Sequence, residues 1–463
     1  MTLIKSISGF RGTIGGQPDK NLTPVDIVNF ATAFAFFIQK ESKKEKPMVV
    51  VGRDARLSGE MLEGLVNNTL VAMGVDVISL GLSTTPTVEM AVTDLNADGG
   101  IILTASHNPK QWNALKLLNS KGEFISADDG EELIKLIEKQ DFNYASIDKI
   151  GKITYDNTQI DKHIQKILAL KLVDVDAIKK AKFKVAIDAV NSTGGISIPP
   201  LLRALGVEEI IELYCEPNGI FPHNPEPLPE HLRDLSELIL NKKADVGFVV
   251  DPDVDRLAIV CENGNPFGEE YTLVAIADYI LRNKKGNTVS NLSSTRALQT
   301  ITHIHEGQYF ASAVGEVNVV EMMKKTKAII GGEGNGGVIY PELHYGRDAL
   351  VGIALFLSLM AKRKQKVSMI RASFPDYFIS KNKINLDEGM DVDKLLEKIA
   401  AKYKNERIST IDGVKIDFDT EWVHLRKSNT EAIIRIYAES NSISKADYLA
   451  DKIKRDIGEF LNA

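Results

Sequence analysis

Residues 100–109 read Gly-Ile-Ile-Leu-Thr-Ala-Ser-His-Asn-Pro, and the rest of the chain can be interpreted outward from them. The apolar run at residues 100–103 predicts a short buried strand. Proline fixes its own φ and keeps the preceding residue out of the helical region, so Asn108-Pro109 predicts a turn. Ser106 is therefore expected on a loop at the end of a strand, where α/β sheets bind their ligands.

The residues around Ser106 favour a site for an anion. Lys110 and Lys116 bring positive charge to this part of the chain, and Trp112 and Asn113 add an aromatic ring and an amide. A phosphoserine carries a charge of about −1.5 to −2, which such surroundings stabilise. The alternative is a serine that only caps a turn.

A second motif, Asp251-Pro-Asp253-Val-Asp255-Arg256, follows an apolar stretch at residues 245–250. Alternate side chains of an extended or tightly turning backbone point the same way, so the three carboxylates come together. A hard cation such as Mg²⁺ relieves their repulsion. An EF-hand is excluded, because Arg256 occupies the position of its required glycine and the flanks are strand-like. A solvated acidic turn remains as the alternative.

A third motif is the glycine-rich run at residues 331–337, Gly-Gly-Glu-Gly-Asn-Gly-Gly, which follows an apolar strand at residues 328–330. Glycines allow a ligand to approach the backbone closely. Glu333 and Asn335 offer hydrogen-bonding groups that suit sugar hydroxyls. The acid and the amide distinguish the run from a dinucleotide-binding fingerprint. A flexible linker is the alternative.

The fourth motif gathers hydrogen-bond donors at a predicted turn between two strands, residues 422–427 and 432–438. Its donor residues are Arg426, Ser428, Asn429, Thr430 and Arg435. Arginine and hydroxyl donors suit a phosphate group. An exposed hairpin with solvated charges is the alternative.

Composition limits the class of protein. The chain has 463 residues, too many for one core, and its net charge of −7 gives no basic surface for nucleic acid. Cys215 and Cys261 have no metal-ligand spacing, which favours a reducing compartment. Residues 1–5 show no signal-peptide pattern, and the most apolar segment, residues 349–361, is too short to span a membrane. We expect a cytoplasmic protein that binds neither nucleic acid nor membrane.

Strand and helix signals alternate along most of the chain, which predicts mixed α/β sheets covered by helices. Residues 25–39 are typical of an amphipathic helix, and residues 47–51, 75–80 and 183–188 predict strands. The last ninety residues or so change character, because two strands precede an amphipathic helix at residues 444–461. That pattern predicts a small α+β domain at the end.

Together, the four motifs resemble those of the α-D-phosphohexomutases, the family of phosphoglucomutases, phosphomannomutases and phosphoglucosamine mutases. They are similar, in order, to that family's phosphoserine, metal-binding, sugar-binding and phosphate-binding loops, over essentially the whole chain. One feature differs. Many members end the sugar-binding loop with Ser-Gly-His, whereas this chain has Asn335-Gly336-Gly337. Any role of that histidine is therefore not transferred here.

The resemblance implies roles for individual residues. Ser106 would carry the phosphoryl group and, with Asp251, Asp253 and Asp255, would bind one Mg²⁺. Further catalytic roles fall on Lys116, on Arg11 within the glycine-flanked loop at residues 8–12, on His107 and on Arg256. Glu333 and Asn335 would bind the sugar, and the donors of the fourth motif would bind its phosphate. A Ser106–His107 dyad is not expected, because neighbours on an extended loop point apart.

The resemblance also implies a fold of three similar α/β domains and a smaller C-terminal α+β domain around a central cleft. The expected domains carry the phosphoserine, metal-binding, sugar-binding and phosphate-binding loops and comprise residues 1–150, 151–257, 258–373 and 374–463.

The expected activity is a phosphoglucosamine mutase that interconverts glucosamine 6-phosphate and glucosamine 1-phosphate. A bound hexose 1,6-bisphosphate would serve as intermediate and activator. A phosphomannomutase/phosphoglucomutase is the main alternative, followed by a non-catalytic sugar-phosphate binding protein and a phosphatase. A monomer or a homodimer would fit.

Overall fold

The computed structural model describes residues 2–6, 9–385, 391–427 and 433–461. The chain forms two compact units, the first made of Met1–Thr272 and Gly336–Met369, the second of Leu273–Asn335 and Ile370–Ala463. None of the helices in the described part of the chain combines the length and the hydropathy of a membrane-spanning segment.

The first sheet of the first unit has seven strands in the order β1-β2-β6-β5-β3-β4-β7. Strands β5, β3, β4 and β7 run parallel, whereas β1, β2 and β6 pair in antiparallel fashion at the other side. The strand bounds are β1 Ile4–Ser6, β2 Gly9–Thr13, β3 Met48–Arg53, β4 Asp76–Leu82, β5 Gly99–Leu103, β6 Trp112–Leu118 and β7 Ile153–Tyr155.

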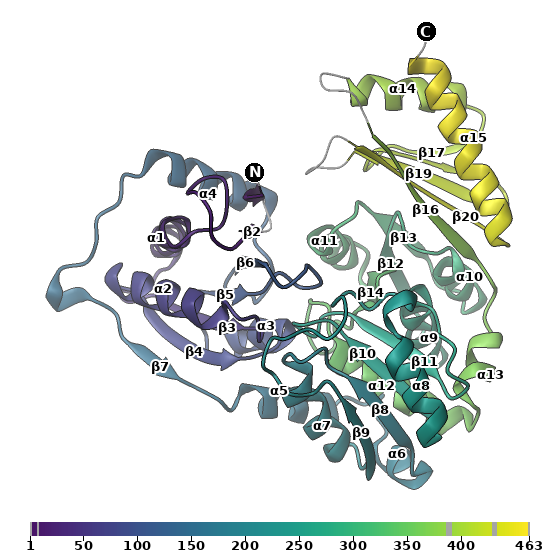
Figure 1. Ribbon diagram of the computed structural model, residues 1–463, viewed down its shortest axis with the longest axis horizontal. Helices are drawn as coiled ribbons and strands as arrows, with labels where there is room; N and C mark the ends of the chain where they lie inside the picture. Colours follow the sequence, from purple (N-terminus) through teal and green to yellow (C-terminus); the bar gives the residue numbers. More distant parts are fainter. Residues whose placement is uncertain (1, 7–8, 386–390, 428–432, 462–463) are drawn as a thin grey trace. The chain divides into compact units, whose positions relative to one another are not determined.

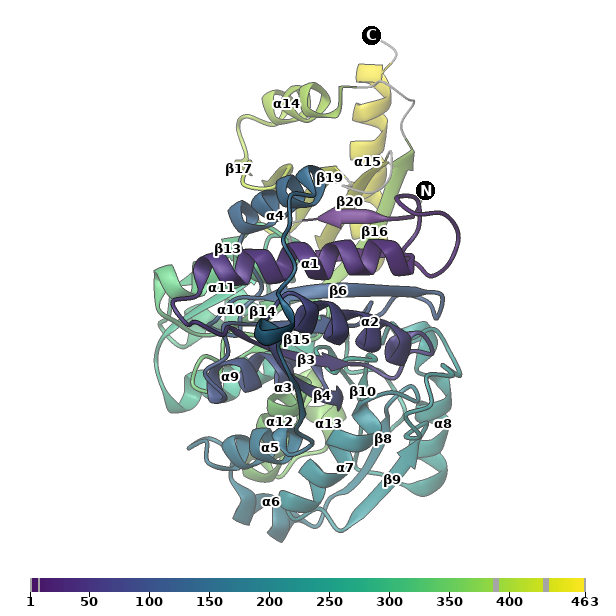
Figure 2. The same ribbon diagram turned by 90° about the vertical axis from the view of Figure 1, so that its left-hand side faces the viewer.

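Helices cover both faces of this sheet (Figure 1). One apolar core includes residues of α1 (Pro24–Glu41), α2 (Gly59–Ala72) and α4 (Ala127–Lys139). A second core packs α3 (Thr85–Asp94) against the strands. Figure 2 shows α1 along its length. Its start is specified locally, because Asp26 accepts from the Thr23 N–H at 3.0 Å as part of a capping box.

The second sheet, in the order β11-β10-β8-β9, places a parallel core of three strands beside the antiparallel β11. Its strands are β8 Lys184–Asp188, β9 Glu209–Leu213, β10 Val246–Val250 and β11 Leu257–Cys261. The helices of this region are α5 Gln159–Leu168, α6 Val175–Ala181, α7 Gly194–Ala204 and α8 Arg233–Lys242, with short 3-10 turns at Ile147–Lys149 and Pro229–His231. Helix α12 (Ala349–Arg363) contacts α5, α6 and α7, and its residues 349–361 are all buried, as expected from their composition.

The second unit contains the parallel strands β13-β12-β14 and a five-stranded antiparallel sheet, β16-β20-β19-β18-β17. The strands are β12 Asn287–Asn291, β13 Tyr309–Ser312, β14 Ala328–Glu333, β16 Phe378–Asn385, β17 Arg407–Ser409, β18 Val414–Asp417, β19 Trp422–Lys427 and β20 Ile433–Ser440. The helices are α10 Ala297–Ile304, α11 Glu316–Thr326, α14 Val392–Lys402 and α15 Ile443–Leu461. The chain passes between the units within α9 Glu269–Asn283 and α13 Val367–Ala372, and just before β15 Gly337–Ile339.

The expected fold class is confirmed. Three regions combine sheets with helices in α/β fashion, and the C-terminal region is an antiparallel sheet with two helices. The apolar face of α15 packs onto that sheet through Leu449, Ala450, Ile453 and Ile457, which is the face that its sequence periodicity indicates.

Candidate active site

Ser106 lies in a tight loop just after β5. Its φ is 48°, in the left-handed region, so the loop is not extended at this residue. The Ser106 N–H donates to Thr104 Oγ1 at 2.9 Å, and that hydroxyl donates to Asp54 Oδ2 at 2.7 Å. Ser106 is 7% exposed. These bonds hold the serine in one position at the end of the strand.

Arg56 holds the same loop through hydrogen bonds to its backbone. Its side chain is fully buried and pairs with Asp54 at 3.0 Å. Its guanidinium donates to four backbone carbonyls, those of Ser106, Asn108, Pro109 and Trp112, at 2.5 to 3.0 Å. A planar guanidinium with five donors can satisfy so many acceptors at once, whereas a lysine cannot. Arg56 therefore fixes the shape of the serine loop.

The three aspartates of the second motif occupy the turn between β10 and β11, and all are completely buried. Asp251 Oδ1 accepts the backbone N–H groups of Asp255 and Arg256 at 3.2 and 3.1 Å. Val254 has a φ of 64°, an unfavourable conformation for a β-branched residue. This strained turn brings the carboxylates within 4.8 Å of one another.

The serine loop and the aspartate loop meet within the first unit. Ser106 Oγ donates to Asp251 Oδ2 at 2.6 Å. Lys116 on β6 pairs with Asp253 at 2.8 Å and approaches Asp255 to 3.7 Å. The residues predicted to carry a phosphoryl group and to bind a cation thus lie together.

Two further side chains contact the aspartates. Arg347 donates to Asp255 Oδ2 at 2.6 Å, and Thr85 Oγ1 donates to Asp253 Oδ2 at 2.6 Å. Thr85 starts α3, and Arg347 precedes α12. Four segments distant in the sequence therefore hold the carboxylates in place.

The electrostatics of this cluster favour a bound cation. Burial, together with the charges of Asp255 and Asp253, raises the pKa of Asp251 well above its ordinary value. Burial also acts to raise the pKa of Asp253, but Lys116 outweighs it and lowers that pKa. Burial acts to lower the pKa of Lys116, yet Asp253 and Asp255 raise it. Lys116 is therefore held as a cation.

The donor set fits Mg²⁺. Among the residues that the structure describes, the buried oxygens Asp253 Oδ1 and Asp255 Oδ1 have no hydrogen-bond partner. Leaving buried carboxylate oxygens unsatisfied is costly, and a hard divalent cation satisfies them with oxygen ligands at about 2.0 to 2.1 Å. The aspartate loop can thus hold one Mg²⁺ beside Ser106.

The position of His107 contradicts the expectation that its side chain and that of Ser106 point apart. Its Nδ1 lies 3.4 Å from Ser106 Oγ, so the two side chains do not point apart. The reason is the left-handed conformation of Ser106, which removes the alternation of an extended strand. Burial and the positive charges of Arg256 and Arg347 lower the pKa of His107 to about 2. The imidazole is therefore neutral and a weak proton acceptor.

Arg256 follows the aspartate loop and is 9% exposed. It pairs with Glu226 at 3.1 Å, and Glu226 also lies 3.9 Å from His107 Nε2. Glu226 belongs to the proline-rich stretch at residues 216–229. This stretch therefore supplies the partner that orients Arg256.

Arg11 is also placed differently from the expectation of a loop. It lies within strand β2, opposite Ala114 of β6. Pairing with β6 extends the sheet across this glycine-flanked segment, because glycine at residue 9 lets the strand approach closely: a Cβ there would lie 2.2 Å from the Leu115 carbonyl oxygen.

Glu333 and Asn335 belong to the second unit, at the end of β14. Glu333 Oε1 accepts from Asn291 Nδ2 at 2.8 Å and from the Gly315 N–H at 3.2 Å, and Asn335 Nδ2 lies 3.5 Å from Glu333 Oε2. The two predicted sugar-binding residues are thus neighbours on a loop that is internally hydrogen-bonded.

The fourth motif also lies in the second unit. Arg426 on β19 pairs with Asp412 at 3.0 Å, and Arg435 is exposed on β20, opposite Arg426 in the ladder. Ser428, Asn429 and Thr430 lie outside the described residues. The structure therefore brings the two arginines of this motif together.

Sequence reasoning missed Arg56, Thr85, Arg347 and Glu226. Arg56 lies in the run Gly-Arg-Asp-Ala-Arg, which directly follows a predicted strand. Polar residues at the end of a strand are the signal that identified Ser106. The other three lie in loops or at helix starts with no distinctive spacing. The residues that these three side chains contact lie 30 to 168 positions away in the sequence.

Family models match nearly the whole chain. They are described as phosphoglucomutase/phosphomannomutase alpha/beta/alpha domains I, II and III and the C-terminal domain, at residues 3–144, 161–264, 268–377 and 383–455. The chain belongs to the phosphoglucomutase/phosphomannomutase family. It is a phosphohexomutase, an isomerase that transfers a phosphoryl group within a sugar phosphate.

Individual relatives support this assignment. A phosphoglucomutase/phosphomannomutase of Thermococcus kodakarensis is 36% identical over 96% of this chain and 97% of its own. A phosphoglucosamine/phosphogalactosamine mutase of Sulfurisphaera tokodaii is 31% identical over 96% and 97%. A crystal structure of a phosphoglucomutase/phosphomannomutase family protein from Burkholderia thailandensis is 27% identical, with a TM-score of 0.84 over 98% and 96% of the two chains.

Proposed function

We propose that this phosphohexomutase is a phosphoglucosamine mutase that works through phosphorylated Ser106. The observation that carries the proposal is the 2.6 Å contact between Ser106 Oγ and Asp251, with Lys116 held on the adjacent Asp253. A serine that exchanges a phosphoryl group needs fixed positive charge and a metal site next to its hydroxyl.

The proposed reaction starts from Ser106 bearing a phosphoryl group. The C1 hydroxyl of a hexosamine 6-phosphate attacks the phosphorus as the bond to Ser106 Oγ breaks. The proton of that hydroxyl passes to Ser106 Oγ, which becomes a free hydroxyl, and a bound 1,6-bisphosphate results. Its 6-phosphate then returns to Ser106 and leaves the 1-phosphate. Mg²⁺ on Asp251, Asp253 and Asp255 would neutralise charge on the transferring group when bound.

The chain's own residues perform the positioning. Arg56 and Thr104 hold the serine loop, so that Oγ faces the aspartates. Lys116 on Asp253 adds a permanent positive charge, and Arg347 adds another at Asp255. Fixed cations of this kind stabilise the charge that develops on the phosphoryl oxygens.

Binding of the rest of the substrate is proposed for the second unit. Glu333 and Asn335 would accept and donate to ring hydroxyls, and Arg426, Arg435 and the motif at residues 428–430 would bind the non-reacting phosphate. We also propose that the chain is divided into four domains, which comprise residues 1–150, 151–257, 258–373 and 374–463.

Specificity for glucosamine is supported by two facts. Several relatives of 30 to 34% identity are named phosphoglucosamine mutases, most of them as probable ones. The glycine-rich loop also lacks the Ser-Gly-His ending of the phosphomannomutase/phosphoglucomutase branch. The second candidate is a phosphomannomutase/phosphoglucomutase, favoured by the 36% identity to the Thermococcus kodakarensis protein of that name.

The deciding experiment measures kcat/KM for the phosphates of glucosamine, glucose and mannose with Mg²⁺ and a hexose 1,6-bisphosphate. Glucosamine phosphate should be turned over fastest. A tenfold preference for glucose or mannose phosphate, about 1.4 kcal/mol, would establish the second candidate instead. Steady release of free phosphate would indicate a phosphatase, and no turnover with retained binding would indicate a binding protein.

Intact-mass measurement tests the role of Ser106 separately. The wild-type protein should gain one phosphate after incubation with the bisphosphate, and Ser106→Ala should gain none. Full mutase activity in Ser106→Ala would overturn the proposed phosphoserine.

A further inference from the structure

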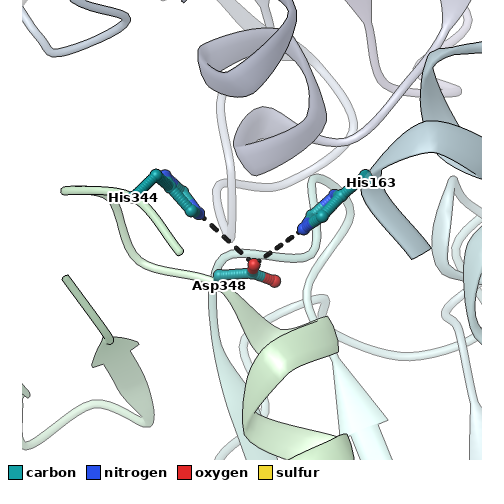
Figure 3. A group of neighbouring side chains, drawn as sticks. All are labelled: His163, His344 and Asp348. Carbon is teal, nitrogen blue, oxygen red and sulfur yellow. Dashed lines mark hydrogen bonds and ion pairs between the residues drawn. The ribbon is translucent and has the colours of Figure 1, made fainter. Parts of the chain in front are cut away.

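A second cluster of ionisable side chains lies in the first unit and has no part in the proposed reaction. His163 comes from α5, Glu89 from α3, and His344 and Asp348 come from the segment between β15 and α12. Figure 3 shows both imidazoles directed at the Asp348 carboxylate. His163, Glu89 and Asp348 are at most 2% exposed, and the His344 side chain is 12% exposed.

The distances in this cluster match those between the ligands of one metal ion. His163 Nε2 and His344 Nε2 lie 2.9 and 3.3 Å from the same oxygen, Asp348 Oδ2. The three candidate ligand atoms lie within 4.8 Å of one another. A tetrahedral zinc ion with ligands at about 2.0 to 2.2 Å places neighbouring ligand atoms roughly 3.3 Å apart.

The other nitrogen of each imidazole also lies near an oxygen of the kind that orients metal-bound histidines. His163 Nδ1 lies 2.9 Å from Thr87 Oγ1. His344 Nδ1 lies 3.3 Å from Glu89 Oε2. Metal-ligating histidines almost always give their second N–H to a carboxylate, a carbonyl or another acceptor, which directs the free nitrogen at the metal. Both rings therefore present Nε2 to a common point.

Asp348 is oriented by its backbone surroundings. Its Oδ1 accepts the N–H groups of Leu350 and Val351 at 2.8 and 3.2 Å, as the N-cap of α12. Oδ2 is thereby directed toward the two histidines. Residues 349–361 of α12 are buried, so the helix that Asp348 caps is firmly packed.

The charge of the cluster calls for a cation. Two buried carboxylates beside two neutral imidazoles would leave uncompensated negative charge, which is strongly unfavourable. The cluster therefore attracts positive charge, from a proton or from a metal ion.

We propose that His163, His344 and Asp348 bind one divalent transition-metal ion of the zinc class, with Glu89 and Thr87 orienting the two histidines. Two imidazoles select Zn²⁺, Co²⁺ or Ni²⁺ over Mg²⁺, which prefers oxygen. The ion is thus distinguished from the Mg²⁺ expected on the aspartate loop. It joins α5 to the start of α12, 185 residues apart for His163 and Asp348, and stabilises the first unit.

The test uses the full-length protein, freed of metal with a chelator and then titrated with Co²⁺ in excess Mg²⁺, which occupies the aspartate loop. Tetrahedral Co²⁺ absorbs visible light much more strongly than octahedral Co²⁺, so the spectrum reports the geometry. One equivalent should bind with the tetrahedral spectrum and raise the melting temperature. Zn²⁺ should displace it stoichiometrically.

Matched variants locate the ion. His163→Gln and His344→Gln should each weaken Co²⁺ binding by at least a hundredfold, whereas His303→Gln, at an exposed histidine of α10, should bind like the wild type. Thr87→Val keeps all three ligands and nearly the same shape. It should weaken binding 10- to 100-fold, because it removes the partner of His163 Nδ1. The other hydrogen bond that it removes, from Thr87 Oγ1 to Thr84 Oγ1 at 2.7 Å, involves no proposed ligand. If a histidine variant fails to fold, Thr87→Val still tests whether the ion binds at His163.

Two results would overturn the proposal. One is a wild-type protein that gives no tetrahedral Co²⁺ spectrum. The other is a spectrum that persists unchanged in His344→Gln and Thr87→Val but is lost in Asp253→Asn, which would place the ion on the aspartate loop.

Discussion

Arg56→Met should release the serine loop without substituting any residue that is proposed to contact substrate. The guanidinium makes five hydrogen bonds, one to Asp54 and four to the carbonyls of Ser106, Asn108, Pro109 and Trp112. Methionine has a similar length and no donors. The substitution therefore removes the hydrogen bonds that Arg56 donates to one buried carboxylate and four carbonyl oxygens.

The expected loss of local stability follows from these five hydrogen bonds. Removing one partner of a buried ion pair costs about 3 to 5 kcal/mol, and each unsatisfied carbonyl adds up to about 1 to 3 kcal/mol where water does not reach it. The terms are not additive, so we expect a local loss of about 3 to 5 kcal/mol. At 1.36 kcal/mol per tenfold change, opening of the loop becomes at least roughly 10²-fold more frequent.

Native-state hydrogen exchange measures this directly. The informative amides are those of Ser106, Asn108 and Trp112, which bond to Thr104 Oγ1 and to the carbonyls of Ala105 and Pro109. They should lose protection in Arg56→Met and keep it in Arg233→Met. Arg233 is an exposed arginine paired with Glu237, and such pairs contribute little.

The pH dependence gives a second check with a defined sign. Burial raises the pKa of Asp54, while Arg56 opposes the rise. Without Arg56 the pKa rises further, so protonation of Asp54 in the folded state sets in at higher pH. The difference in stability between variant and wild type should therefore shrink as the pH falls. Unchanged protection of the three amides in Arg56→Met would refute the role given to Arg56.

Three further outcomes are expected. Asp253→Asn should fold normally yet lose several kcal/mol of transition-state stabilisation, and chelation of Mg²⁺ should abolish wild-type turnover, because the unpartnered Asp253 Oδ1 is proposed as a metal ligand; unchanged rates with chelator would contradict this. Arg347→Met should lower kcat while half-saturation by Mg²⁺ moves to lower concentration, because it removes a cation from Asp255; weaker Mg²⁺ binding in steady-state titrations would be inconsistent with that reasoning. Burial lowers the pKa of His424 to about 4, below its unfolded value of about 6.5, so stability should fall by up to about 3 kcal/mol as the pH drops between these values. NMR titration of the imidazole, and a smaller acid sensitivity in His424→Gln, would check this, and titration near pH 6.5 would disprove it.

The sequence by itself determined the elements and the chemistry of the individual loops. Apolar runs bounded by glycine, proline or aspartate predicted β3, β5, β8 and β10, because a buried strand and the turn after it have strong local signatures. The same locality identified Ser106 and the three aspartates, since each motif is one strand end followed by polar residues. The resemblance of four such motifs, in order, to one family then indicated the phosphohexomutase class.

Only the tertiary structure decided which side chains meet. Ser106 reaches Asp251 across 145 residues, and Lys116 reaches Asp253 across 137. The left-handed backbone at Ser106, which brings His107 toward Oγ, has no signal in the residue type, because serine rarely adopts it without support from its surroundings. The cluster of His163, His344 and Asp348 is of the same kind. His344 and Asp348 are four residues apart, but only the packing of α5 against the start of α12 brings His163 to them.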